Sequence, residues 1–310
     1  MAFLKRILIF NALLFTPLHA HMRLHYPPSF AAENNPHRTG PPDNQLEYPY
    51  NCCGKITIYP CRGYLNLLGS DQGKPVARWS AGSAQNFTLI GTGNHYGGSC
   101  QAGFSVDKGK TWKVISSYEG NCPHRRGRSD TPSEQAFQFT VPSDMPPGDH
   151  VFAWTWINRE QEFYMLCSPV TITAKAAAGL PSNSAFPSPP VPAPSSLPKD
   201  SASLAGIYPP RQINRPTRQP ELEPTIASKS VRRRGRFKVK EGRRGPENED
   251  PPANHSAFDA RPGFLIANIG NGCKTVNGKA EVKYPNPGPD IVRGDGEYPL
   301  ELPWPINKCS

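Results

Sequence analysis

Apolar and polar residues alternate in several short runs between residues 21 and 174, and turn-forming residues separate the runs. In one run, the alternation places Phe152, Trp154 and Trp156 on one face of a strand and smaller residues on the other. No stretch of similar length has the period of a helix. The pattern predicts an all-β fold, an antiparallel β-sandwich like that of immunoglobulin and fibronectin domains, with long loops. The strand-like runs are QNFTLIG (85–91), QAGFSVDKGKTWKVISSY (101–118), QAFQFTVP (135–142), HVFAWTWIN (150–158) and PVTIT (169–173).

The first part of this domain, residues 21–80, has little regular alternation. The stretch PHRTGPPDNQLEYPYNCCGK (36–55) is rich in residues that favour turns, which is typical of long loops. Because three cysteines lie in or just after this stretch, we expect disulfides to pin the loops. The adjacent Cys52 and Cys53 are not expected to pair with each other.

The first twenty residues have the features of a secretory signal peptide. Lys5 and Arg6 precede an apolar run over 7–15, and the segment ends in the small residue Ala20. The run is too short to cross a membrane, and no other stretch approaches eighteen apolar residues. We therefore expect a secreted, extracellular protein that has no membrane anchor and whose mature chain begins at His21.

Charge and proline mark a linker. Residues 175–260 carry a net charge of +6 out of the +10 of the whole chain, and 15 of the 37 prolines lie between residues 181 and 252. Such a composition buries too little apolar surface to offset chain entropy, which predicts a disordered linker. Its basic tract RRRGRFKVK (232–240) suits a solvated or wall-associating segment better than a nucleic-acid site, and its dibasic positions are candidate sites of proteolysis.

Residues 261–310 are expected to form a small, loop-rich tail module. All eight cysteines follow the signal peptide, and an even number in a secreted chain indicates disulfides. Two of them, Cys273 and Cys309, are expected to close the tail. The module either binds carbohydrate through Tyr284, Tyr298 or Trp304 or has no function of its own.

A histidine at a mature N-terminus has special chemistry. The free amine and the imidazole of His21 would chelate one metal ion, and a second imidazole opposite them would complete a set of three nitrogens that suits copper. His95 is one candidate, because glycines flank it in GTGNHYGGSC (91–100) and Cys100 would pin its loop. His25, close in sequence, is the rival. Of the other histidines of the domain, His124 and His150 are more simply surface residues.

Several blocks resemble the fungal chitin-active lytic polysaccharide monooxygenases of auxiliary activity family eleven, and the resemblance covers residues 21–174. The resemblance implies an immunoglobulin-like sandwich with a copper ion held by the amine and imidazole of His21 and the imidazole of His95. It also implies that Tyr164 lies axial to copper and that Glu162 acts in the outer sphere, although Gln161 offers an alternative polar group. Tyr96 is expected to stack on a sugar ring. The blocks are HMRLHYPPSF (21–30), GSAQNFTL (82–89), GNHYGGSCQ (93–101), SYEGNCP (117–123) and FAWTWINREQEFYMLC (152–167).

The function implied is oxidative cleavage of glycosidic bonds by a monomeric copper enzyme. The expected partners are an insoluble polysaccharide, with chitin favoured and cellulose possible, an external electron donor, and oxygen or hydrogen peroxide. The segment EYPYNCCGKITIYPCRGY (47–64) is longer and richer in cysteine than is usual in the family, which makes the substrate less secure than the metal. The alternative is a non-catalytic secreted protein of the same fold that binds copper, or binds chitin in the cell wall.

Disulfides and N-glycosylation are also expected. The resemblance predicts a Cys100–Cys122 disulfide and a partner for Cys167 among Cys52, Cys53 and Cys61. Asn86 in NFT and Asn254 in NHS match the pattern of N-glycosylation acceptors.

Overall fold

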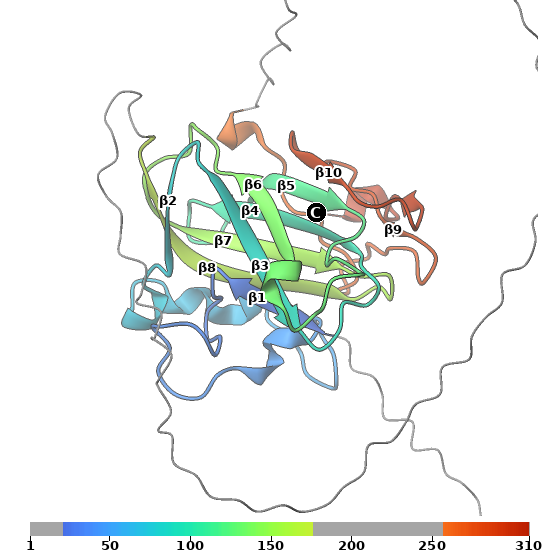
Figure 1. Cartoon of the computed structure of the whole chain (residues 1–310), viewed down its shortest axis with the longest axis horizontal. Helices are drawn as coiled ribbons and strands as arrows, with labels where there is room; N and C mark the ends of the chain where they lie inside the picture. Colours follow the sequence, from blue (N-terminus) through green and yellow to red (C-terminus); the bar gives the residue numbers. More distant parts are fainter. Residues whose placement is uncertain (1–20, 176–256, 310) are drawn as a thin grey trace, which may run out of the picture. The chain divides into compact units, whose positions relative to one another are not determined.

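The computed structural model describes residues 21–175 and 257–309, which belong to one compact unit (Figure 1). The expected signal peptide, most of the expected linker and Asn254 lie outside the described residues. The described structure resumes at residue 257, inside the range expected for the linker. Here Phe258 is buried in the core and its backbone N–H donates to Asp144 Oδ2 at 2.7 Å.

Two sheets form the sandwich, as the alternation predicted. A three-stranded antiparallel sheet has the order β1-β3-β6 and crosses the larger sheet in Figure 1. The larger sheet has the order β10-β5-β4-β7-β8-β2, with its four central strands antiparallel and its two outer strands parallel to their neighbours. A short parallel pair, β9 and β11, forms a separate two-stranded sheet. The strands are β1 (Met22–Tyr26), β2 (Ala77–Ser80), β3 (Ala84–Gly91), β4 (Ser99–Ser105), β5 (Lys113–Glu119), β6 (Ala136–Thr140), β7 (Gly148–Ile157), β8 (Phe163–Thr173), β9 (Glu281–Val282), β10 (Ile291–Arg293) and β11 (Leu300–Glu301).

All helices of the described residues are short 3₁₀ turns, and none has the length and apolar character needed to cross a membrane. Three of them lie in the long loops of residues 27–76, where the sequence has little alternation. They are η1 (Asn44–Glu47), η2 (Cys61–Leu67), η3 (Asp71–Gly73), η4 (Pro132–Glu134), η5 (Phe258–Ala260) and η6 (Ile306–Lys308).

The larger sheet is buried on both faces. The side chains of Phe152, Trp154 and Trp156 in β7 belong to the core between the two sheets. Val151 and Ala153, which alternate with them, belong to a second core on the opposite face. The alternation predicted for β7 is therefore confirmed, and each of its two faces meets a different layer of the protein.

Residues 257–309 cover much of that second face. Phe264, Leu265 and Ile266 are buried in the second core, together with residues of the long N-terminal loops. Backbone contacts fasten the segment to the sheet, because Val114 N donates to Pro262 O at 2.9 Å and Leu265 N donates to the side chain of Gln101 at 2.9 Å. The segment expected as a tail module thus shares one compact unit with the sandwich.

The aromatic residues proposed for carbohydrate binding in this segment have very different exposure. Tyr284 is buried in the second core, which removes it from the candidates. The side chain of Trp304 is 75% exposed.

Four disulfides use all eight cysteines. Cys61 pairs with Cys167, Cys100 with Cys122, and Cys273 with Cys309. Cys52 pairs with Cys53, contrary to the expectation from their adjacency. Because every other cysteine has a partner elsewhere, these two neighbours are left to each other.

Packing of Phe264 on the sheet gives a test of this architecture. The Phe264 ring lies over Gly103 of β4, so close that a Cβ at position 103 would approach it within 2.7 Å. We expect Phe264→Ala to lower the free energy of unfolding by about 3–5 kcal/mol in urea denaturation. The control is Val292→Ala, which shortens a half-exposed residue of β10 and should change the free energy of unfolding by less than about 0.5 kcal/mol. Equal effects of the two substitutions would contradict the covering role of the segment.

Candidate metal centre

Three chain segments meet at one end of the sandwich. His21 directly precedes β1, and Met22 pairs with Gly91 at the end of β3. The loop 92–98, which carries His95, leads from β3 into β4, where Ser99 pairs with Ile157 at the end of β7. The turn 158–162 then joins β7 to β8. Strand pairing therefore brings residues far apart in sequence to a single edge.

The structure brings the two predicted histidines together at this edge. The rings of His21 and His95 have centroids 5.8 Å apart and lie almost perpendicular, at 87°. His21 is buried, with 6% of its surface exposed, and its carbonyl accepts a hydrogen bond from Thr92 N at 2.9 Å. The rival His25 instead lies beside Thr88, with its Nδ1 3.2 Å from Oγ1 of that residue.

The loop around His95 has an unusual backbone. His95, Tyr96, Gly97 and Gly98 all have positive φ, at 47°, 54°, 103° and 120°. A Cβ at position 98 would lie 2.6 Å from both Ile157 O and Trp156 Nε1, so a glycine is required there by space as well as by φ. The glycines noted in the sequence thus allow the β-sandwich to approach the loop closely.

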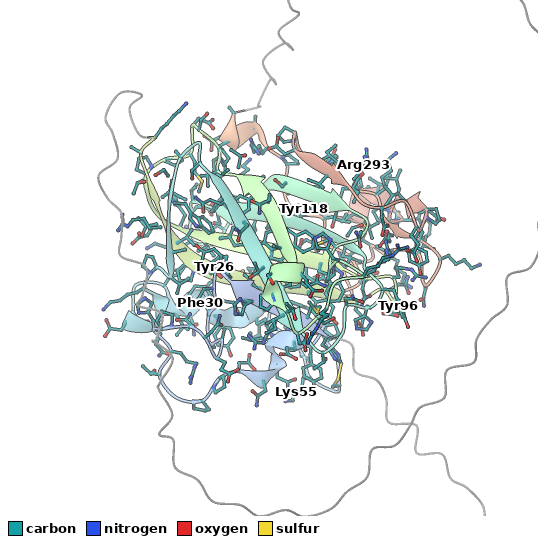
Figure 2. The ribbon with its side chains drawn as sticks, in the orientation of Figure 1. Tyr26, Phe30, Lys55, Tyr96, Tyr118 and Arg293 are labelled. Atoms are coloured by element: carbon teal, nitrogen blue, oxygen red, sulfur yellow. A yellow bond between two sulfur atoms is a disulfide. The ribbon has the colours of Figure 1, made fainter. Side chains whose placement is uncertain are left out.

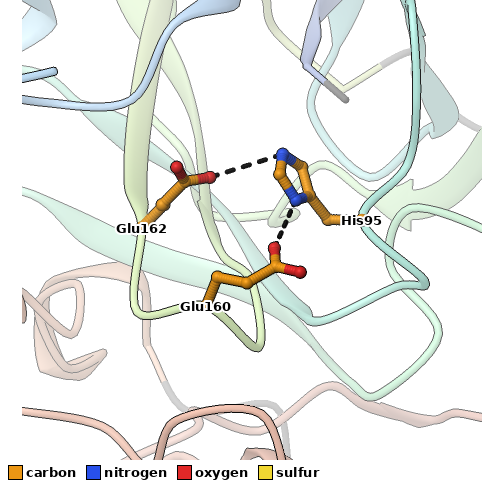
Figure 3. A group of neighbouring side chains, drawn as sticks. All are labelled: His95, Glu160 and Glu162. Atoms are coloured by element: carbon orange, nitrogen blue, oxygen red, sulfur yellow. Dashed lines mark ion pairs between the residues drawn. The ribbon is translucent and has the colours of Figure 1, made fainter. Parts of the chain in front are cut away.

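Two carboxylates from the turn 158–162 approach the His95 ring (Figure 3). Glu160 contacts Nδ1, and Glu162 Oε2 lies 3.4 Å from Nε2. The three side chains offer ligand atoms within 4.8 Å of one another. The Gln161 side chain, the alternative to Glu162, turns away and donates to Thr275 O. Glu160 escaped prediction, because no local pattern indicates the positive φ of Gln161 in the turn that brings Glu160 to His95.

Asn158 organises this turn and was also missed from the sequence. Its Oδ1 accepts hydrogen bonds from the backbone N–H groups of Glu160 and Glu162, both at 3.0 Å, and its Nδ2 donates to Glu162 Oε2 at 2.6 Å. An asparagine just after a strand favours such a turn, so a signal for it exists in WINREQE (156–162).

Tyr164 lies beside the carboxylates. It is buried, its ring stacks on Trp156 with centroids 4.4 Å apart, and its hydroxyl donates to Glu162 Oε2 at 3.1 Å. Burial, together with the negative charge of Glu162, raises the pKa of the Tyr164 hydroxyl above its ordinary value. The phenol therefore stays protonated and acts as a donor. Tyr48, which the sequence did not single out, packs its ring 4.6 Å from that of His21.

Tyr96 follows His95 and projects from the loop at the edge of the molecule (Figure 2). Its side chain is 68% exposed. Asn86, the predicted N-glycosylation acceptor that lies within the described residues, is half-buried in β3 opposite Gln138.

The donor atoms present fit a metal ion held by imidazoles. His95 Nε2 is buried and makes no hydrogen bond, although it lies beside a second imidazole and a carboxylate. A buried polar atom without a partner is rare in proteins and needs an explanation. A carboxylate at Nδ1, as Glu160 is here, commonly orients a metal-binding histidine and leaves the other nitrogen for the metal. Imidazole nitrogens in this arrangement suit copper among the divalent metals.

The relatives found by comparison with known proteins carry the same family name. The chain is 35% identical over 176 residues to AA11 family lytic polysaccharide monooxygenase A of Aspergillus fumigatus, covering 54% of this chain and 72% of the relative. It is 33% identical over 130 residues to an AA11 family lytic polysaccharide monooxygenase of Aspergillus oryzae, covering 38% of this chain and 30% of the relative. No family model matches the chain.

Similarity to solved structures is weaker. A cellulose-active polysaccharide monooxygenase from M. thermophila aligns with a TM-score of 0.26 at 12% identity, over 32% of this chain and 54% of that one. AA10A of T. fusca aligns with a TM-score of 0.21 at 18% identity, over 30% of this chain and 50% of that one.

The close packing at Gly98 can be tested by a single methyl group. We expect Gly98→Ala to lower the free energy of unfolding more than Gly69→Ala does, because both glycines have positive φ but only Gly98 has neighbours in the way. Gly69→Ala, with no atom near its Cβ, should lose only the left-handed backbone preference, about 1–2 kcal/mol. Urea denaturation of both variants measures the difference, and equal losses would show that the loop does not pack against β7 as described.

Proposed function

Because the chain belongs to the AA11 family of lytic polysaccharide monooxygenases, we propose that it is a secreted copper enzyme that oxidatively cleaves glycosidic bonds in chitin. The observation that carries this proposal is the perpendicular pair of imidazoles, His21 and His95, at one edge of the sandwich. Cellulose or another crystalline polysaccharide is the second substrate to test.

His21 and His95 are the proposed copper ligands. In a mature chain that begins at His21, the free amine would join the two imidazoles. Bound copper would supply one-electron chemistry with an external donor and with oxygen or hydrogen peroxide. Glu160 holds Nδ1 of His95, which leaves Nε2 as the nitrogen available to the ion.

Glu162 is the residue proposed to hold or move a proton. Its Oε2 receives hydrogen bonds from Asn158 and Tyr164, and these two donors orient the carboxylate toward the His95 ring. A carboxylate fixed at this point can accept a proton at Oε2 and return it without large motion. The ring of the buried donor Tyr164 is in turn fixed by stacking on the buried Trp156.

An open edge suits a solid substrate, because a crystalline polysaccharide cannot enter a pocket. Tyr96 is adjacent to His95 and largely exposed, so its ring is the proposed contact with a sugar face. The nearby loop that follows Tyr50 also exposes apolar side chains, with Ile56 91% exposed. Tyr50 N donates to Phe163 O at 2.8 Å, which fastens the base of this loop next to Glu162.

The alternative is a non-catalytic protein of the same fold that binds copper or chitin. The organised carboxylate favours catalysis, because metal storage needs ligands but no oriented proton acceptor. The two candidates differ in a direct assay of the copper-loaded protein with chitin, cellulose and a reductant. Oxidised oligosaccharides in the mass spectrum support the enzyme, and bound copper without products on any substrate supports the alternative.

Substitution of His95 tests the ligand assignment. We expect His95→Ala to weaken copper binding at least tenfold in calorimetric titration and to abolish oxidised products, because one of two imidazoles is lost. His37→Ala is the matched control, since His37 lies in a loop where its Nε2 contacts Pro75 O, and it should behave like the parent. Tyr164→Phe should keep copper. Parental copper affinity in His95→Ala would contradict the assignment.

Glu162→Gln separates catalysis from binding in the same assays. The amide cannot take up a proton, so we expect product formation to fall about 100-fold or more while copper affinity changes much less than in His95→Ala. A fully active Glu162→Gln protein would exclude the proposed proton role.

A further inference from the structure

The segment 257–309 reaches the metal centre through a buried carboxylate, Glu281. Only 1% of its side chain is exposed. Its Oε1 accepts hydrogen bonds from Gly98 N at 2.8 Å and from Asn121 N at 3.0 Å. Arg125 Nη2 donates to both carboxylate oxygens, at 3.0 and 3.1 Å. Glu281 therefore holds the backbone of the His95 loop from a segment that is remote in sequence.

Arg125 extends this contact to the other side of the same loop. Its Nη1 donates to Tyr96 O at 2.6 Å, so the loop is held at Tyr96 O and at Gly98 N, on either side of Gly97. Asp295, also from the segment, accepts from Arg125 Nε at 2.8 Å and from Nη2 at 2.9 Å. The guanidinium is thus fixed by two carboxylates of the segment, and it is almost fully buried.

The backbone held in this way is one that the chain does not adopt by itself. Four consecutive residues, His95 to Gly98, have positive φ, and two of them carry side chains. Such a conformation persists only where the surroundings over-determine it. Glu281 and Arg125 provide such surroundings, because they contact the backbone at Gly98 N and at Tyr96 O.

The same segment also holds the carboxylate turn. Gly278 N donates to Arg159 O at 2.6 Å, and the Arg159 side chain donates back to Gly278 O. Gln161 donates to Thr275 O. Residues 275–278 therefore bracket Glu160 on both sides.

A single ring connects the two loops. Tyr298 lies under the guanidinium groups of both Arg125 and Arg159, at 4.7 and 3.5 Å from its centroid. Arg125 holds the His95 loop, and Arg159 belongs to the turn that carries Glu160 and Glu162. The distance between the imidazole and the carboxylates thus depends on residues of the C-terminal segment.

We propose that residues 257–309 act as a clamp that sets the geometry of the metal centre, with Glu281 as its main positioning residue and Tyr298 as the link between the loops. The clamp is non-covalent, because the only disulfide of the segment, Cys273–Cys309, is internal to it. The proposal deepens the proposed function and rests on it for the identity of the metal.

The first test needs no metal. Hydrogen–deuterium exchange of the copper-free full-length protein should show faster exchange of peptides covering residues 94–98 in Glu281→Ala, by tenfold or more, because Gly98 N–H loses its acceptor. Glu281→Gln keeps one acceptor oxygen and should lie between the parent and Glu281→Ala. Asp290→Asn is the matched control, because Asp290 is a carboxylate of the same segment and lies 3.3 Å from Arg261. This substitution should leave hydrogen–deuterium exchange at residues 94–98 unchanged.

The second test reads the metal. In copper-loaded protein, Glu281→Ala should change the copper(II) electron paramagnetic resonance spectrum and weaken copper binding about tenfold or more, while Asp290→Asn keeps the parental spectrum. A folded Glu281→Ala protein with parental exchange and parental spectrum would overturn the clamp. So would a change of equal size in Asp290→Asn, because the effect would then follow general stability.

Two further outcomes are distinguishable. If Glu281→Ala does not fold, Tyr298→Leu takes its place, because its half-exposed ring can be removed with less damage to the core, and an unchanged spectrum in that variant would overturn the clamp. If the parent protein binds no copper, the proposed function fails, while exchange at residues 94–98 still decides whether the clamp exists.

Discussion

Burial of the larger sheet on both faces is the constraint on which the rest of the structure depends. Three of the four central strands, β5, β7 and β8, carry apolar side chains on both sides, so one face needs the small sheet and the other needs a second cover. The long N-terminal loops supply part of that cover, and residues 257–309 supply the rest. A segment needed first for packing is thereby brought to the edge where the candidate metal centre lies.

That edge combines regular strand pairing with a left-handed backbone in the His95 loop. Strand pairing aligns the start of β1, the β3–β4 loop and the β7–β8 turn, which places His21, His95 and Glu162 together without any single motif. The left-handed backbone at His95 aims one imidazole toward the other. Contacts from Asn158, Arg125 and Glu281 hold these positions through hydrogen bonds to backbone atoms.

Local signals explain what the sequence could predict. The alternation around Phe152 predicted a strand with two distinct faces, and the chelating chemistry of a terminal histidine directed attention to His95. Glu160 and Asn158 were missed because their directions follow from one turn, and Glu281 was missed because the partners of its side chain lie 156 to 183 residues away in the sequence. The Cys52–Cys53 pair was wrongly excluded, since adjacency gives no information about which other partners are taken.

The central claim is that His21 and His95 form a copper site completed by the free amine of His21. Copper(II) titration of two preparations tests it most directly, one beginning at His21 and one with a single additional alanine before it. The account predicts one copper ion per chain in the first and binding weaker by tenfold or more in the second, because the added residue moves the amine away from the chelate. Equal affinity in both preparations would contradict it.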